Sequence, residues 1–183
     1  MYTEEELIRQ CLNNDVKAQE FLYRRFAPKM FGVCLRFAKN QMEAEDLLQE
    51  GFIKVFLNLK SFRGEGSLEG WIRRTMVNTA INCYKKHIKY QKEVAIDQDE
   101  SYLPQISEQI NELSIQELLK LIANLPSGYR MVFNLNVIEG YTHKEIGKLL
   151  NISENTSKSQ LSRARSTLQK IISRLQGGNE KNE

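Results

Sequence analysis

The chain has 183 residues, of which 41% are hydrophobic and 27% are charged, and its formal net charge is +3. This length and apolar content suit one ordinary domain or two small ones and exclude a disordered chain. This net charge is too small to indicate nucleic-acid binding by itself. Evidence for such binding must come from how the charges are distributed along the chain.

Apolar residues recur at helical spacing almost throughout the chain, which predicts an all-α protein with negligible strand content. Thr3 and Glu6 have the capping-box spacing at the start of the first predicted helix. A second helix begins near Lys17, and Pro28 predicts a junction or kink. The later elements of this half are a long helix at about 42–59, a loop at 61–67, and a helix from Leu68.

An acidic segment then separates two helical units. Residues 93–112 contain six acids and no lysine or arginine, whereas residues 70–92 contain six lysines or arginines and no acid. The acidic segment is polar, contains Pro104 and lacks an apolar stripe, which predicts a flexible linker. The predicted domains are 1–92 and 113–176, with a disordered tail at 177–183. Helices are expected at about 115–123, 127–138, 142–150 and 154–175.

The segment from Tyr141 to Ile171 predicts two amphipathic helices joined by a tight turn. Thr142 and Glu145 have the capping-box spacing, and Ser153 is the expected N-cap of the second helix. One side of the second helix carries Ser157, Leu161, Ala164 and Leu168; the other carries Asn155, Ser159, Ser162 and Ser166, flanked by Lys158 and Arg163. Such a small, polar and basic face suits a recognition helix in a major groove. An ordinary helical hairpin with a solvated face is the alternative.

Two segments of the first unit have side chains that suggest binding functions, but sequence patterns alone do not decide between the alternatives. Glu43, Glu45, Asp46, Gln49 and Glu50 crowd one helix, and they predict either a solvated face or a docking surface for a basic partner. A carboxylate metal site is disfavoured because no Glu-x-x-His spacing accompanies them. The segment SFRGEGSLEGWIRRTMVNTAINCYKK, residues 61–86, mixes aromatic, amide and cationic side chains, which suits single-stranded DNA.

Other features argue against catalysis and export. His87 and His143 stand apart from any nucleophile or acid pattern, so we expect no enzyme, no metal and no cofactor. His143 is expected to be exposed near a helix start. The widely spaced Cys11, Cys34 and Cys83 favour buried reduced thiols in a cytoplasmic protein. We also expect no membrane insertion, because no apolar run has spanning length.

Three segments, in this order, resemble one family. AEDLLQEGFIKVF at 44–56, residues 61–86 and residues 125–170 are similar to regions 2.2, 2.3–2.4 and 4 of bacterial sigma-70 family RNA polymerase sigma factors of the extracytoplasmic function (ECF) group. The resemblance implies a region 2 helical bundle and a region 4 helix-turn-helix. It implies binding of core RNA polymerase and promoter-specific initiation, through recognition of -10 and -35 elements and stabilised melting. The implied partners are the beta-prime clamp helices, the beta subunit, promoter DNA and an anti-sigma factor.

The resemblance also assigns roles to individual residues. Polymerase contacts would be Asp46, Gln49, Glu50, Phe52 and Phe56. Contacts to the -10 element would be Phe62, Arg63, Arg73, Arg74, Asn78, Asn82, Lys85 and Lys86, with Asn78 in a pocket for a flipped base near Phe62. Contacts to the -35 element would be Asn155, Thr156, Lys158, Ser159, Ser162 and Arg163.

Two positions of the recognition helix depart from the family pattern. Ser157 stands where a branched apolar residue is frequent, and Gln160 stands where a basic residue is common. We therefore expect a less tightly anchored recognition helix. A stand-alone DNA-binding regulator that uses only its helix-turn-helix, and a metal-dependent nucleic-acid-processing enzyme, are the alternative functions.

Overall fold

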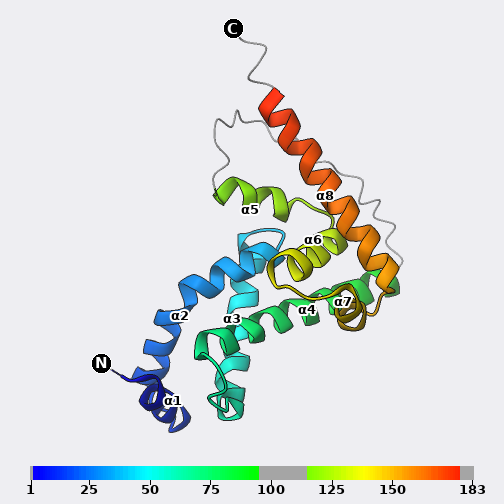
Figure 1. The fold of residues 1–183 in the computed structure, drawn as a ribbon. Helices are drawn as coiled ribbons and strands as arrows, with labels where there is room; N and C mark the ends of the chain where they lie inside the picture. The colour runs from blue at the N-terminus through cyan, green and yellow to red at the C-terminus, as the bar shows by residue number, and fades with distance from the viewer. Residues whose placement is uncertain (1, 95–114, 178–183) are drawn as a thin grey trace. The chain divides into compact units, whose positions relative to one another are not determined.

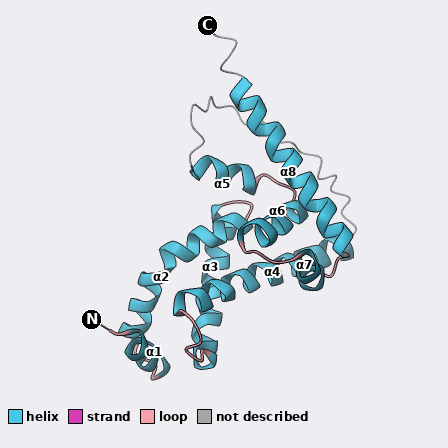
Figure 2. Cartoon of the chain, in the orientation of Figure 1, coloured by secondary structure: helices cyan, strands magenta, loops and turns pink. Residues whose placement is uncertain are grey.

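The computed structural model describes residues 2–94 and 115–177, and its regular elements over these ranges are all helices (Figures 1 and 2). The all-α prediction is thereby confirmed. The chain forms two compact units, residues 1–83 and 84–183. The predicted linker at 93–112 and almost all of the predicted tail lie outside the described residues, so the predicted domain boundaries stay predictions.

The first unit is built from helices with side-chain caps. The helices are α1 (Glu4–Leu12), α2 (Val16–Phe37), α3 (Gln41–Asn58), a short 3-10 helix (Leu59–Ser61) and α4 (Leu68–Val94), the last of which continues beyond the unit. Thr3, Asp15 and Asn40 accept hydrogen bonds from the first-turn amides of α1, α2 and α3. These side chains satisfy amides that have no partner within their own helix.

Of the two outcomes expected at Pro28, the junction is wrong, because α2 runs through it as one helix, and the kink stays a prediction. Pro28 removes one N–H donor but lies on the exposed side of α2, where water can reach the carbonyl left without a donor. Its neighbours Phe26 and Met30 are buried on the other side. Burial of that apolar side outweighs the loss of one backbone hydrogen bond.

The core of the first unit draws on every helix. Its fully buried side chains include Leu7 of α1, Leu22 of α2, Val55 of α3 and Ile72 of α4. Helix α2 packs along α3 and also against α1 (Figure 1). Helix α3 and the part of α4 up to Cys83 therefore belong to one packed body, which holds the predicted polymerase residues and the predicted -10 residues other than Lys85 and Lys86.

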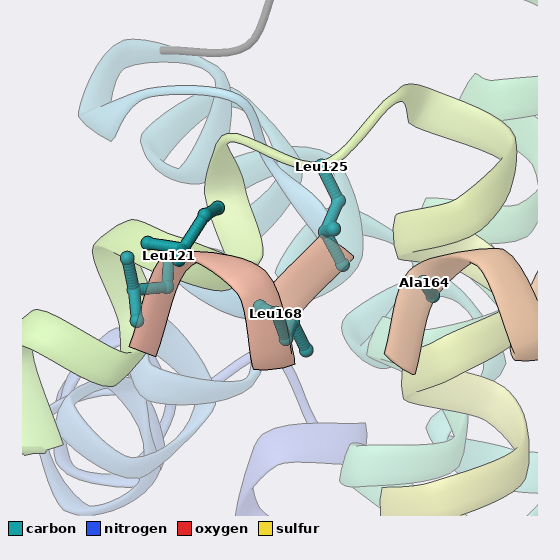
Figure 3. Packing of buried hydrophobic residues seen from close by; sticks show 5 residues of the cluster. Leu121, Leu125, Ala164 and Leu168 are labelled. Carbon is teal, nitrogen blue, oxygen red and sulfur yellow. The ribbon is translucent and has the colours of Figure 1, made fainter. Parts of the chain in front are cut away.

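The second unit contains α5 (Ile115–Ala123), α6 (Ser127–Phe133), a π-helical turn (Asn134–Ile138), α7 (His143–Leu150) and α8 (Glu154–Gly177). These bounds agree closely with the predicted helices. Helices α6 and α7 both pack on α8. Its core cluster consists of Leu121, Leu125, Ala164, Leu168 and Ile171 (Figure 3).

Arg130 fixes the corner between α5 and α6. It is a buried arginine whose guanidinium donates to the carbonyls of Ala123, at 2.5 Å, and Leu125, at 3.0 Å. These carbonyls lie at and just beyond the end of α5, where backbone acceptors lack helical partners. Satisfying them with a charged donor sets the direction in which α6 leaves α5.

Candidate nucleic-acid interface and docking surface

The helix-turn-helix geometry is set by a capped start and a tight turn. The Thr142 hydroxyl accepts from the Glu145 amide, and the Glu145 carboxylate accepts from the Thr142 amide at 2.8 Å. The Thr142 hydroxyl also donates to the Glu145 carboxylate, at 2.7 Å, and this hydrogen bond, with the one from the Thr142 amide, holds the pKa of Glu145 below its usual value. Helix α7 ends at Leu150, and its C-cap Asn151 has left-handed backbone angles of φ 57° and ψ 47°. The predicted capping box and turn are both confirmed.

Gly147 allows the chain to fold back closely after α7. The Ile152 amide donates to the Gly147 carbonyl at 3.0 Å. A Cβ at Gly147 would lie 2.9 Å from the Ile152 carbonyl oxygen, which is a backbone atom of the turn. A side chain at this position would therefore push α7 and α8 apart.

Replacing Gly147 with alanine is expected to destabilise the second unit by about 1–3 kcal/mol, because the turn must shift to admit the methyl group. Denaturant unfolding followed by circular dichroism measures the change. Gly32→Ala is the matched control: Gly32 lies inside α2 and a Cβ there meets nothing within 4 Å. That control should gain about 0.5–1 kcal/mol from helix propensity. Equal effects of the two substitutions would contradict the steric role of Gly147.

Helix α8 separates a buried side from an exposed side as predicted. Ser157, Leu161, Ala164 and Leu168 are buried, whereas Asn155, Ser159, Ser162 and Ser166 are exposed, as are Lys158 and Arg163. The Ser153 hydroxyl accepts from the Thr156 amide at 2.9 Å, which is the predicted N-cap. The predicted -35 residues therefore share the outer side of α8, except that Thr156 is half-buried beside Ser153.

Several of these side chains are held in position by neighbours. Lys158 forms an ion pair with Glu154 at 2.7 Å, and this contact lowers the pKa of Glu154. Arg163 donates to the Tyr129 hydroxyl of α6 at 3.3 Å. The Ser159 hydroxyl donates to the Thr156 carbonyl at 3.0 Å.

The departure at Ser157 is accommodated by a contact that the sequence did not suggest. Ser157 is fully buried, and its hydroxyl is 2.9 Å from Nδ1 of His143, the first residue of α7. The helix start expected for His143 is confirmed, but the side chain is half-buried rather than exposed. A hydrogen bond between α7 and α8 thus stands where the family often has a branched apolar residue, and the expectation of a less tightly anchored helix stays a prediction. Gln160 is half-buried, with its amide near Gly128 of α6.

Helix α3 presents an apolar and acidic strip to solvent. Asp46 and Gln49 are exposed, and so are Met42, Ile53 and Leu57, whose exposed fractions are 72%, 59% and 70%. Positions 42, 46, 49, 53 and 57 follow one another at helical spacing on a single side. We call these five residues the α3 strip. Sequence reasoning missed its apolar members, although the run of apolar residues near Ile53 is larger than one core-facing side needs.

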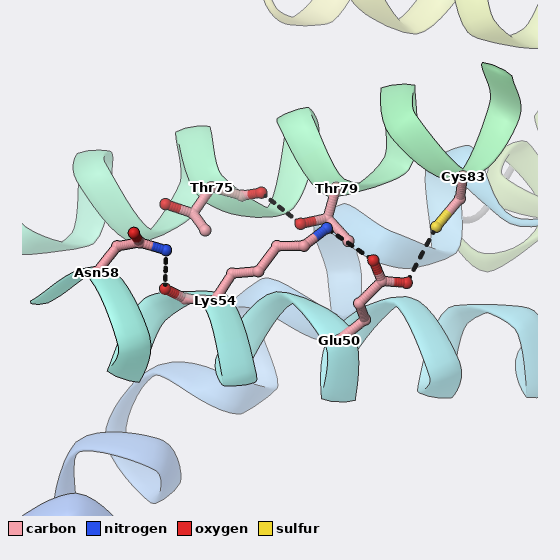
Figure 4. Close-up of polar contacts among 6 residues, drawn as sticks. All are labelled: Glu50, Lys54, Asn58, Thr75, Thr79 and Cys83. Carbon is pink, nitrogen blue, oxygen red and sulfur yellow. Dashed lines mark hydrogen bonds and ion pairs between the residues drawn. The ribbon is translucent and has the colours of Figure 1, made fainter. Parts of the chain in front are cut away.

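Glu50 lies beside the α3 strip and faces α4. Its carboxylate pairs with Lys54 at 2.7 Å and accepts from the Cys83 thiol of α4 at 3.3 Å (Figure 4). Phe52 is buried, with its ring centroid 4.7 Å from that of Tyr23 and 6.2 Å from that of Phe56. Phe52 therefore packs beneath the exposed surface of α3, whereas Phe56 is half-buried and borders that surface.

Helix α4 carries the predicted -10 residues along one line. Arg74, Asn78, Asn82 and Lys86 are exposed and recur every four residues, with exposed Lys85 beside them and Arg73 half-buried. Half-buried Phe62 packs on Trp71, with ring centroids 5.8 Å apart, and Arg63 is exposed in the preceding loop. Asn78 lies about two turns beyond Trp71, so its place in a pocket near Phe62 stays a prediction.

The buried thiols are chemically quiet. Burial raises the pKa of Cys11 to about 11, with help from Asp15, and raises the pKa of Cys34 to about 12. Both are free thiols in the core, as expected, whereas Cys83 is likewise a reduced thiol but is half-buried rather than buried. In the parts of the chain that the structure describes, no group of three His, Cys, Asp or Glu residues is arranged to hold a metal ion. None of the described helices has the length and apolar character of a membrane span.

Two family descriptions match the chain in the order of its units: Sigma-70 region 2 over residues 22–89, and Sigma-70, region 4 over residues 115–168. The chain belongs to the sigma-70 family. This sigma factor is 27% identical to the ECF RNA polymerase sigma-E factor of Haemophilus influenzae, over 94% of this chain and 97% of that protein. It is 24% identical to the RNA polymerase sigma-H factor of Pseudomonas aeruginosa, over 94% and 95%. These relatives agree with the predicted ECF group.

A solved structure supports the fold. The sigma factor RpoE from Bartonella quintana, in complex with the anti-sigma factor NepR, matches with a TM-score of 0.51 and 23% identity. The match covers 86% of this chain and 98% of that chain. The region 2 match begins within α2, so α1 lies outside it.

Proposed function

We propose that this sigma factor binds core RNA polymerase and directs it to promoters, reading a -10 element with its first unit and a -35 element with its second. The observation that carries the proposal is the occurrence of regions 2 and 4 in one chain, each with an exposed face suited to its task. The protein performs no bond chemistry in this role and requires no cofactor. It acts in the cytoplasm, where the polymerase works.

Docking to the polymerase is assigned to the α3 strip. The side chains of Ile53 and Leu57 expose apolar surface. A partner that covers this surface removes it from water, which would stabilise the complex. Asp46 adds a negative charge next to that area. A partner with apolar and basic side chains on a helical surface complements this strip, and the beta-prime clamp helices are the proposed partner.

Recognition and melting of the -10 element are assigned to the outer line of α4 and the loop before it. The amides of Asn78 and Asn82 can hydrogen-bond to the edges of unpaired bases, and Arg74 and Lys86 can hold the backbone. Trapping an unstacked base stabilises the melted strand, because the base no longer returns to its stack.

The -35 element is assigned to the outer side of α8. Small side chains such as Ser159 and Ser162 permit close approach to base edges, and Arg163 at the border of this face can reach a phosphate or the edge of a guanine. Each good bidentate contact contributes about 1–3 kcal/mol of discrimination. An anti-sigma factor that covers these exposed faces is the proposed means of keeping the protein inactive, as the complex of the Bartonella relative with NepR suggests.

Transcription in vitro with core polymerase tests the proposal directly. Core enzyme with this protein should start transcripts at defined positions on a genomic template, and core enzyme alone should not. Absence of defined starts on every genomic template would overturn the proposal. If the protein then bound duplex operators tightly without polymerase and failed to capture core enzyme, a stand-alone regulator would be the better account.

Asn78→Ala is expected to reduce open-complex formation by about 5- to 150-fold, which corresponds to the loss of about 1–3 kcal/mol of base contact. Binding to core polymerase should change less than about twofold, because Asn78 is exposed on α4 and is not a member of the α3 strip. Permanganate footprinting measures melting, and a core-binding titration measures docking. Gln116→Ala, which removes an exposed amide on α5, is the matched control. Parallel losses of melting and docking would refute a role specific to base capture.

A further inference from the structure

Helix α8 carries two rows of exposed basic side chains that extend past the predicted -35 residues. Lys158 and Arg165 are seven residues apart, and so are Arg163 and Lys170; all four are exposed. Seven residues make almost two full turns, so the members of each pair lie along one line, about 10 Å apart. We call the first pair the Lys158 row and the second the Arg163 row.

The two rows flank a neutral strip. At about 100° per residue they lie about 140° apart around the helix axis. The exposed residues between them are small or uncharged, namely Asn155, Ser159, Ser162, Ser166 and Gln169. On the remaining side of α8 lie Leu161, Ala164 and Leu168, which pack into the core. The helix thus has a buried side, a neutral outer side and a basic row at each border.

The sign of the charge is also uniform. After Glu154, no aspartate or glutamate occurs from Asn155 to the end of α8 at Gly177. An exposed face that serves only solubility mixes both signs. Lys158 is neutralised by Glu154, and Arg163 is held by Tyr129. Within the described ranges, no ion pair engages Arg165 or Lys170, so no described carboxylate offsets the charge of these outer members of the two rows.

This pattern complements the walls of a DNA major groove. The groove is about 12 Å wide and is bordered by two phosphate backbones, and a helix with its side chains is about 10–12 Å across. A helix whose neutral strip faces the groove floor directs one basic row toward each backbone. Phosphate contacts of this kind fix register and orientation and carry no sequence information themselves.

We propose that Arg165 and Lys170 bind the phosphates of the two backbones that border the -35 groove and thereby extend the DNA interface along α8 beyond the base-reading residues. The inference rests on the proposed function, and it names a duplex phosphate backbone as the ligand. Arg165 continues the line of Lys158 along one backbone, and Lys170 continues the line of Arg163 along the other. The base-reading strip is centred between them.

Salt dependence separates phosphate contacts from base contacts. The test measures binding of the full-length chain to a 30-base-pair duplex pool of random sequence, by fluorescence anisotropy, between 50 and 200 mM KCl. Arg165→Ala and Lys170→Ala should each reduce the slope of log K against log salt by about 0.9. Between these two salt concentrations, the affinity ratio of wild type to variant should fall by about 3.5-fold. Arg165→Lys should keep the slope, because it keeps the charge, and Gln169→Ala should leave it unchanged.

The possible outcomes distinguish this inference from the proposed function. Unchanged slopes in both alanine variants, with wild-type binding intact, would overturn the phosphate assignment and leave the sigma function standing. A loss confined to particular sequences in a -35 selection would also overturn it, because a phosphate contact weakens all sequences alike. Failure of the wild-type chain to bind any duplex, alone or with core polymerase, would remove the proposed function together with the inference.

Discussion

Leu121→Ala is expected to unfold the second unit and to leave the first unit folded. Leu121 is 1% exposed and belongs to the small core shared by α5 and α8. Truncating a buried leucine to alanine costs about 2–5 kcal/mol. A core in a unit of this size rarely supplies more than about 3–5 kcal/mol of net stability, so one such cavity removes most of it. Hydrogen exchange should show lost protection in α5 to α8 and retained protection in α1 to α3.

A leucine on the same helix gives the control. Leu118 is 40% exposed, so Leu118→Ala removes the same atoms with little loss of buried area. We expect a change within about 1 kcal/mol. In functional terms, the Leu121 variant should lose dependence on the -35 element while it still binds core polymerase. Loss of protection throughout both units would show that they unfold together, contrary to this expectation.

Ile53→Arg is expected to weaken binding to core polymerase by at least about 30-fold. Ile53 lies between Gln49 and Leu57 in the α3 strip and is 59% exposed, so the free protein tolerates a charge there. At the centre of an interface, the same charge would be desolvated against an apolar and basic partner, and central positions of this kind cost about 2 kcal/mol or more. A titration of labelled core enzyme measures the affinity. Thermal unfolding should show that the substitution changes the free energy of unfolding by less than about 0.5 kcal/mol.

Leu12→Arg is the matched control for this substitution. Leu12 is 45% exposed at the end of α1, so the same charge is added to an apolar surface position outside the α3 strip. Its core binding should stay within about twofold of wild type. If Ile53→Arg bound core enzyme as tightly as Leu12→Arg, the docking surface would lie elsewhere on the protein.

Local patterns predicted the helices of the second unit well, because their signals are local. The capping box at Thr142 and the alternation of buried Leu161 and Ala164 with exposed Ser162 follow from spacing alone. A helix junction at Pro28 was predicted wrongly because the cost of proline depends on whether it faces solvent or the core, and local sequence does not reveal that.

Contacts between distant residues account for the rest of what the sequence did not reveal. The His143–Ser157 hydrogen bond joins residues fourteen positions apart, and the Glu50–Cys83 contact joins residues thirty-three apart. Periodicity assigns a residue to a side of its helix but not to a partner on another helix. In α3, apolar residues surround much of the helix, so only the packed structure separates buried Val55 from exposed Ile53.

The contacts of Glu50 indicate which residues of α3 would supply the free energy of binding to core polymerase. Both of its carboxylate oxygens already have partners in the free protein, Lys54 at one and Cys83 at the other. A cationic side chain of the polymerase would have to replace Lys54 as the counterion, and exchanging one ion pair for another changes the free energy little. We therefore expect Glu50 to help select a partner of the right charge while it contributes little to affinity. The apolar members of the α3 strip, which exchange water for protein contacts, would supply most of the binding free energy.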